Sequence, residues 1–424
     1  MLKRGIKKWD LVLLFINGII GAGIFGLPSE VFRLSGFYSL PAIFLCAVII
    51  FVLVFNFAEV SSRFDKTGGP YLYTLAAFGK IPAFIIGWLL LITRIFVYAA
   101  LINLLVTYLS YFYPELLNQS YRFGLITTVT LILWWVNYLG IKSSTILSNT
   151  LAVAKLLPLA IFIVVGLFFV NPELIDINQP PPTLPDFSST VLILVFAFTG
   201  FEAILVNTGE VQNPGRNLPF ALTMSMVLIA TFYIFIQFVS IGTLPELASS
   251  DKPITDAARL FMGPPGAILI TLGAVISIGG TLNAVMLIGS RVPFALSEEN
   301  QFPPLFSRLH SKYLTPVHSL LAFACISLIA SLTGSFIYSV SISVISKVLI
   351  LLMVSAAMIK LRRKDTPDIT FYKLRYGYFF AIAGILASIW LLSSSKMTEL
   401  RDVLITVAIG LILFGAYKLI SRKN

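Results

Sequence analysis

The sequence contains few charged residues, which make up only 12% of its 424 amino acids. Soluble domains carry about a quarter charged residues, so a water-soluble fold of this chain would lack polar surface. Hydrophobic residues make up 58% of the chain, and the mean hydropathy is +0.93. Apolar runs of about 20 residues, the length that crosses a bilayer, recur along the whole sequence. We therefore expect a chain that is almost entirely a membrane domain.

Cysteine and histidine are also scarce, with two residues of each. Cys46 and Cys325 both lie in apolar runs, so we expect neither a disulfide framework nor a cysteine-based metal site. An enzyme would need a nucleophile, an acid–base pair or metal ligands at one depth, and no HExxH, GxSxG or cysteine–histidine set occurs. We expect no enzyme activity, no metal and no cofactor.

The hydropathy pattern predicts an all-α integral membrane protein with about twelve transmembrane helices in a single domain, residues 1–424. The predicted spans are 9–36, 38–62, 82–112, 121–139, 145–170, 188–210, 216–243, 264–297, 316–334, 336–361, 375–394 and 399–421. An even number of spans places both termini on the same side of the membrane.

The distribution of lysine and arginine predicts which side that is. Twenty of the 30 basic residues fall on the side of the N-terminus and six on the other, so both termini are expected in the cytosol of a multi-pass plasma membrane protein. This asymmetry explains the net charge of +11 without a nucleic-acid partner. The basic cluster of Lys360, Arg362, Arg363 and Lys364 is expected to meet anionic lipid head groups.

Two of the predicted helices carry interruptions. The first span contains Gly18, Gly21, Gly23 and Gly26, and each glycine weakens a helix by roughly 1 kcal/mol relative to alanine. The sixth span has a milder break at Phe198-Thr199-Gly200-Phe201-Glu202. Each break falls in the first helix of a five-helix block, 1–170 and 188–361, and 375–421 would add two further helices.

Paired interruptions are typical of transporters built from two inverted repeats, whose binding site lies at the bilayer midplane. Unwound backbone leaves N–H and C=O groups that a polar ligand satisfies, and a helix N-terminus attracts a carboxylate. Such a site suits an α-amino acid. The alternative is that glycines such as Gly21 and Gly23 only permit close helix packing.

Three stretches resemble the amino acid-polyamine-organocation (APC) superfamily of permeases. They are Gly21-Ala22-Gly23-Ile24-Phe25 with Leu27-Pro28, the segment from Arg63 to Tyr71, and Phe198–Glu202 running into Gly209–Pro219. The resemblance covers nearly the whole chain and implies the LeuT-like five-plus-five inverted-repeat helix bundle with two extra C-terminal helices.

The resemblance also implies a set of substrate-binding residues. The backbone at Ala22, Gly23 and Ile24 would hold the substrate carboxylate. The amino group would meet carbonyls near Ile19 and around Phe196, Thr199 and Gly200. Phe196, together with Phe201, would act as a gate over the substrate, although some relatives carry tryptophan at the Phe196 position and both rings are equally compatible with core packing.

Lys155 lies about ten residues into the fifth span, roughly 15 Å along the helix, which is too deep for easy snorkelling. Burial favours the neutral form of a lysine, and some members of the family have a lysine here in place of a sodium ion. We interpret Lys155 as the residue that couples proton movement to transport. The alternative is a permanently charged lysine that braces neighbouring helices, as in an exchanger.

Arg94 and Lys347 are comparably deep in the third and tenth spans. The fork of an arginine fits a carboxylate, so these cations would select an acidic or strongly polar substrate side chain. The alternative is that Arg94 pairs internally with Glu202. Glu59 and Arg63, at the inner end of the second span, belong either to an inner gate or to helix packing.

Together these patterns predict a secondary active amino acid transporter that works by alternating access, with proton-coupled symport of an L-amino acid preferred. An exchanger with the same fold is the alternative, and a non-transporting amino acid sensor is a more distant one. A channel is disfavoured, because paired helix breaks indicate alternating access. The expected partners are the amino acid and the lipid bilayer; the coupling ion is the proton, and the oligomeric state is not predicted.

Overall fold

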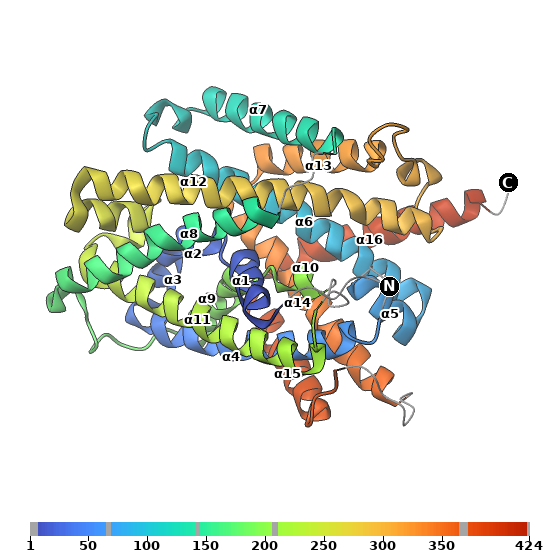
Figure 1. Cartoon of the computed structure of the whole chain (residues 1–424), viewed down its shortest axis with the longest axis horizontal. Coiled ribbons are helices and arrows are strands. Elements are labelled where there is room, and N and C mark those ends of the chain that lie inside the picture. The colour runs from blue at the N-terminus through green and yellow to red at the C-terminus, as the bar shows by residue number, and fades with distance from the viewer. Residues whose placement is uncertain (1–6, 65–68, 141–144, 206–210, 364–371, 422–424) are drawn as a thin grey trace. The chain divides into compact units, whose positions relative to one another are not determined.

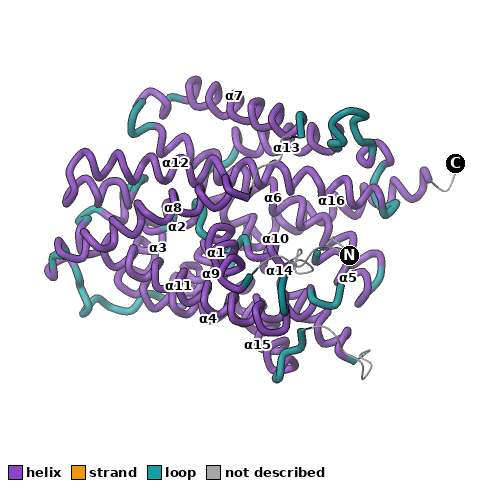
Figure 2. The backbone as a smooth tube through the Cα atoms, in the orientation of Figure 1, coloured by secondary structure: helices purple, strands orange, loops and turns teal. Residues whose placement is uncertain are grey.

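The computed structural model describes residues 7–64, 69–140, 145–205, 211–363 and 372–421. Every regular element in these ranges is a helix, and no strand occurs among them (Figures 1 and 2). Some residues named in the predictions lie outside the described ranges. They are 1–6 of the N-terminal tail, 65–68 and 209–210 of two motif stretches, and Lys364 of the basic cluster.

The chain divides into two compact units, each assembled from three stretches of sequence. The first unit comprises 1–67, 144–277 and 354–394, and the second comprises 68–143, 278–353 and 395–424. The helices of the first unit are α1 (Lys8–Ile19), α2 (Gly23–Gly26), α3 (Pro28–Ser35), α4 (Ser39–Ser61), α8 (Thr145–Gly166), α9 (Leu184–Leu194), α10 (Phe201–Leu205), α11 (Pro214–Thr243) and α15 (Gly377–Ser393). Those of the second are α5 (Pro70–Phe78), α6 (Lys80–Leu109), α7 (Gln119–Tyr138), α13 (Val317–Thr333) and α16 (Met397–Ser421).

Two long helices, α12 (Pro253–Glu298) and α14 (Phe336–Arg362), begin in one unit and end in the other. α12 is longer than the predicted span 264–297, because a helical segment precedes Gly263, where φ is +68°. Pro264 and Pro265 follow, and neither has an N–H to continue the earlier hydrogen-bond ladder. The helix therefore kinks at Gly263, immediately before the predicted span begins.

Helices occupy all twelve predicted ranges, since long apolar runs have no other way to satisfy their backbone in a bilayer. Six helical stretches of the described chain are long and apolar enough to cross a membrane: 28–61, 80–109, 216–243, 253–298, 336–362 and 397–419. The twelve-span count and the division into two inverted repeats stay predictions.

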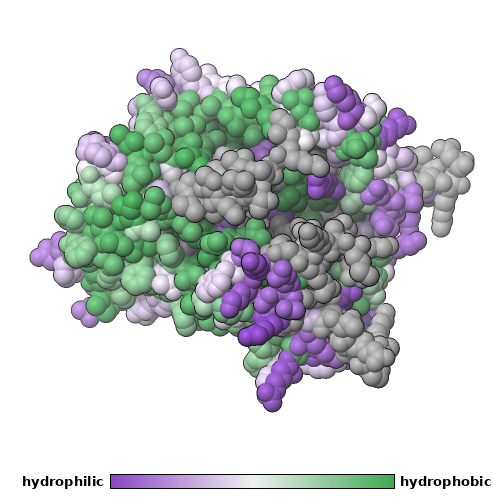
Figure 3. Space-filling model, in the orientation of Figure 1, coloured by the Kyte–Doolittle hydropathy of each residue, from purple (hydrophilic) through white to green (hydrophobic). Residues whose placement is uncertain are grey.

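Large apolar side chains on the surface agree with a lipid environment. Phe168 is 85% exposed, and Phe379 and Ile412 are each 69% exposed. Figure 3 shows hydrophobic residues over broad areas of the face in view. Surfaces of this kind on a monomer mark contact with a membrane or a partner, because water solvates them poorly.

Within the first unit, α11 packs against α1, α4 and α8, and α9 packs against α3 and α4. Polar side chains join some of these helices in the interior. The hydroxyls of Ser35 in α3 and Thr190 in α9 are 2.7 Å apart, and the Asn56 amide of α4 donates to the Phe380 carbonyl of α15 at 2.9 Å. The broken helices therefore lie within a packed bundle.

Candidate functional site: two interrupted helices

The first predicted span is broken where its glycines cluster. α1 ends at Ile19, Ile20 is extended with ψ of 99°, and the helix resumes at Gly23. Pro28 then occupies the first position of α3, where its missing N–H costs no hydrogen bond. The interruption predicted near the middle of the span is confirmed.

Several backbone groups at this first break lack hydrogen-bond partners in the part of the chain that the structure describes. The Ala22 carbonyl accepts from the N–H groups of Phe25 and Gly26, both at 3.0 Å. Among the described residues, no acceptor is found for the N–H groups of Ala22, Gly23 and Ile24, and no donor for the Ile19 carbonyl. Ala22 is 2% exposed and Ile24 is 5% exposed, so water does not freely supply these bonds.

The second break lies at the predicted place as well. A 3₁₀ segment, Val195–Phe198, precedes Thr199, which is extended with ψ of 160°, and α10 begins at Phe201. Between them Gly200 has φ of +120°, a conformation that favours glycine. A Cβ at this position would also lie 2.1 Å from the Gly18 carbonyl oxygen, so only glycine fits.

The two breaks touch each other. A Cβ added to Gly23 would lie 2.5 Å from Cα of Ala197, and the Gly200 backbone lies against Gly18. The structure thus brings Ile19, Ala22, Gly23 and Ile24 together with Phe196, Thr199 and Gly200, as the family resemblance implies. Their contact with a substrate stays a prediction.

Some carbonyls proposed for the amino group already have donors. The Phe196 carbonyl accepts from the Thr199 N–H at 3.3 Å and from the Thr199 hydroxyl at 2.8 Å. The Ala197 carbonyl accepts from the Tyr233 hydroxyl of α11 at 2.7 Å. Because a carbonyl oxygen has two lone pairs, that of Phe196 is filled. The carbonyls of Ile19 and Phe198, which have no donor among the described residues, fit an ammonium better.

The two proposed gate rings differ in their surroundings. Phe201 is fully buried and packs edge-to-face on Phe57 of α4, with the ring centroids 5.8 Å apart. Phe196 is 7% exposed at the break itself. This arrangement favours a packing role for Phe201 and leaves Phe196 as the ring placed to cover a ligand, although gating by either residue stays a prediction.

Lys155 lies in α8, which packs against α1 and α11. Its side chain is 5% exposed, and no hydrogen-bond acceptor or carboxylate partner is found for it among the described residues. Pro158, one turn further along α8, packs against Gly273 of α12, where an added Cβ would lie 3.0 Å from the proline ring. A buried lysine without a carboxylate is poorly stabilised in its charged form.

Glu202 forms a hydrogen bond within the second break, next to which it lies. Its carboxylate oxygen Oε2 accepts from the Gly200 N–H at 3.1 Å, and its side chain is buried. Glu202 belongs to the first unit, whereas Arg94 of α6 and Lys347 of α14 belong to the second. The roles expected for Arg94, Lys347 and Glu202 in selectivity or internal pairing stay predictions.

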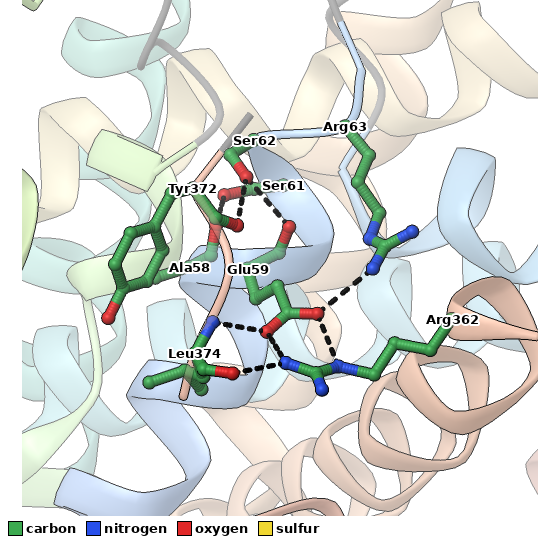
Figure 4. A network of polar contacts seen from close by, with 8 residues as sticks. All are labelled: Ala58, Glu59, Ser61, Ser62, Arg63, Arg362, Tyr372 and Leu374. Atoms are coloured by element: carbon green, nitrogen blue, oxygen red, sulfur yellow. Dashed lines mark hydrogen bonds and ion pairs between the residues drawn. The ribbon is translucent and has the colours of Figure 1, made fainter. Parts of the chain in front are cut away.

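Glu59 has a partner that the sequence did not indicate. At the end of α4 its fully buried carboxylate accepts from Arg63 at 2.9 Å, from Arg362 at 2.7 and 2.5 Å, and from the Leu374 N–H at 2.8 Å (Figure 4). Arg362 also donates to the Leu374 carbonyl at 2.7 Å. The expectation that Arg362 faces lipid head groups is wrong, because its side chain is only 6% exposed and bound to Glu59.

The same carboxylate affects Tyr372, which precedes α15. Burial, and then the nearby charge of Glu59, raise the pKa of the Tyr372 hydroxyl above its ordinary value. Tyr372 also fixes the chain through its carbonyl, which accepts from the Ser62 hydroxyl at 3.2 Å. The segment before α15 is therefore joined to the end of α4 by hydrogen bonds, one of them to a charged carboxylate.

Paired breaks in buried apolar helices are typical of membrane transporters whose main chain offers polar groups to small ligands. Comparison with known proteins narrows the class, since the family model described as amino acid permease matches residues 6–414. The chain belongs to this amino acid permease family of the APC superfamily, and it is an amino acid transporter.

Several characterised relatives match over most of their length. The serine/threonine exchanger SteT of Bacillus subtilis is 27% identical over 96% of this chain and 95% of its own. The branched-chain amino acid permease BcaP of the same organism is 27% identical over 100% of this chain and 94% of its own. The arginine/agmatine antiporter of Chlamydia pneumoniae is 25% identical over 93% and 86%. These relatives are transporters rather than enzymes, and their names cover both exchange and permeation.

Proposed function

We propose that the protein is a secondary active transporter that carries an L-amino acid across the plasma membrane by alternating access. The observation that carries this proposal is the contact between the two interrupted segments, Gly18–Ile24 and Phe196–Gly200. Unpaired N–H groups at the first break suit the substrate carboxylate, and free carbonyls at both breaks suit its ammonium. Both termini would face the cytosol.

Symport with a proton is the preferred mode, with Lys155 as the coupling residue. A lysine buried without a carboxylate partner in the described chain gains and loses a proton more readily than an exposed one. Its proton would leave or bind as the cycle proceeds, which links the gradient to reorientation. No cofactor is required by this mechanism.

Exchange is the second candidate, favoured by the serine/threonine exchanger and the arginine/agmatine antiporter among the relatives. In that case Lys155 stays charged and braces α8 against α1. A sensor that binds an amino acid without moving it is a third and weaker candidate.

The deciding experiment is uptake of radiolabelled amino acids into proteoliposomes, with and without an inward proton gradient, for wild type, Lys155→Ala and Lys155→Arg. Arginine retains a positive charge and cannot release its proton at physiological pH. Proton coupling predicts gradient-driven accumulation in wild type and its loss in both variants. A brace predicts that Lys155→Arg keeps transport and only Lys155→Ala loses it.

The same vesicles separate the remaining candidates. Uptake that ignores the gradient but rises when unlabelled amino acid is loaded inside identifies an exchanger. Binding of an amino acid without uptake in either format identifies a sensor and contradicts the proposal.

A further inference from the structure

Helix α11 contacts both interrupted helices at the place where they meet. Tyr233 and Gln237 lie four residues apart, on one face of α11, and each is 1% exposed. Both side chains line a small cavity together with Gly23, Pro28 and Ala197. The transport mechanism described above uses neither residue.

Tyr233 completes the second break. In a continuous helix the Ala197 carbonyl would accept from the Phe201 N–H, but Gly200 turns the chain away with φ of +120°. The Tyr233 hydroxyl donates to this carbonyl instead, at 2.7 Å. The Tyr233 ring also packs edge-on against Phe198, with the centroids 5.0 Å apart. Without the hydroxyl, a buried carbonyl at the break would lack its donor.

Gln237 holds the segment that follows the first break. Its amide nitrogen donates to the Pro28 carbonyl in the first turn of α3 at 3.2 Å and to the Ser39 hydroxyl at the start of α4 at 3.1 Å. Pro28 is two residues beyond the end of α2, which begins at the first break. One turn of α11 thus bonds to the segment after the first break and to the segment before the second.

Because the two breaks are in direct contact, the hydrogen bonds of Tyr233 and Gln237 depend on each other. Gly23 lies so close to Ala197 that even a methyl group would not fit between them. A shift of the Ala197 segment therefore moves Gly23, and α11, which is hydrogen-bonded to both Ala197 and Pro28, carries the same shift to Pro28. Packed interiors pass on such displacements because they contain little free volume.

We infer that Tyr233 and Gln237 are positioning residues. Gln237 fastens residues 23–35, which follow the first break, to α11, and Tyr233 fastens residues 190–198, which precede the second break, so that both segments form one rigid body with this helix. The inference rests on the proposed transport function, since it assigns to α11 the task of keeping the shape of the substrate-binding backbone. The two segments then move together during the cycle, and the spacing between the free N–H groups and carbonyls stays constant.

The test compares Tyr233→Phe and Gln237→Met with the matched control Tyr98→Phe. Tyr98 of α6 is also fully buried, and its hydroxyl makes one side-chain hydrogen bond, to Thr130 at 3.0 Å. The first readout is amide hydrogen exchange in lipid nanodiscs. Loss of the hydrogen bonds of either side chain is expected to speed amide exchange about tenfold in peptides from both 20–35 and 190–200. Tyr98→Phe should leave both segments unchanged.

The second readout is uptake kinetics in proteoliposomes. Both α11 variants are expected to raise KM for the preferred amino acid about tenfold, as a misplaced ligand-binding backbone would, whereas Tyr98→Phe keeps the wild-type KM. Faster exchange in only the segment next to the altered residue, or a KM equal to that of the control, would overturn the inference. If wild type took up no amino acid, the proposed function would fail, and hydrogen exchange would still decide the role of α11.

Discussion

The guanidinium of Arg362 forms a two-pronged ion pair with the Glu59 carboxylate, with Nε to Oε1 at 2.7 Å and Nη2 to Oε2 at 2.5 Å. Both side chains are buried, and Arg63 and the Leu374 N–H fill the remaining acceptor sites of the carboxylate (Figure 4). An added Cβ at Gly377, in the first turn of α15, would overlap the Arg362 guanidinium. One carboxylate therefore fastens the ends of α4 and α14 and the start of α15.

Replacing Glu59 by glutamine is expected to destabilise the protein by about 3–5 kcal/mol, because Arg362 would be left buried without its counter-charge. The measurement is the unfolding free energy from a denaturant titration of purified protein in mixed micelles. Glu115→Gln, at an exposed position, is the matched control and should change little. The double variant Glu59→Gln/Arg362→Met removes both charges and should regain much of the lost stability. A double variant as unstable as Glu59→Gln alone would refute the ion-pair explanation.

Gly23→Ala is expected to abolish most transport. Its methyl group would meet Ala197 at 2.5 Å, and such overpacking costs about 1–3 kcal/mol and displaces backbone. The expected result is at least a tenfold fall in initial uptake rate with protein still present in the membrane. Gly124→Ala in α7 is the control, since open space surrounds that position and uptake should persist. Normal uptake by Gly23→Ala would show that the two breaks separate easily.

Gly200→Ala tests the second break through its backbone conformation. A φ of +120° costs a residue with a Cβ about 1–3 kcal/mol, and this Cβ would also collide with the Gly18 carbonyl. We expect a lower melting temperature and loss of uptake. Gly415→Ala in α16 has no such neighbour and should behave as wild type in both assays. Equal melting temperatures for the two variants would argue that residue 200 readily adopts another conformation.

Substrate selectivity tests the role proposed for Arg94. If Arg94, which is partly exposed, receives a substrate carboxylate, wild type should take up glutamate faster than leucine or alanine, and Arg94→Gln should reverse the preference. The control is Arg401→Gln, because Arg401 is 67% exposed and pairs with Asp402 at the surface. Glutamate uptake no better than that of leucine or alanine would support internal pairing of Arg94 instead.

The sequence alone predicted the helices and both interruptions. A run of about 20 apolar residues has to be helical in a bilayer, and this local constraint places α4 and α6 within a few residues of their predicted ranges. Glycine acts locally too, so the breaks at Gly21–Gly23 and at Gly200 followed from composition. The resemblance to the APC superfamily rested on these stretches and on two others, whereas family membership is shown by the match over residues 6–414.

Only the tertiary structure decided which groups meet. Arg362 lies 303 residues from Glu59, and its position in a basic cluster indicated lipid contact rather than an ion pair. Tyr233 resembles any other tyrosine in an apolar run until the bundle places its hydroxyl on the Ala197 carbonyl. Hydropathy specifies that a segment is a helix but leaves its neighbours undetermined, because pairing depends on how whole surfaces pack. The sequence by itself determined where the helices form and break, and packing decided which carbonyls at the break keep a free lone pair and which residues hold them in place.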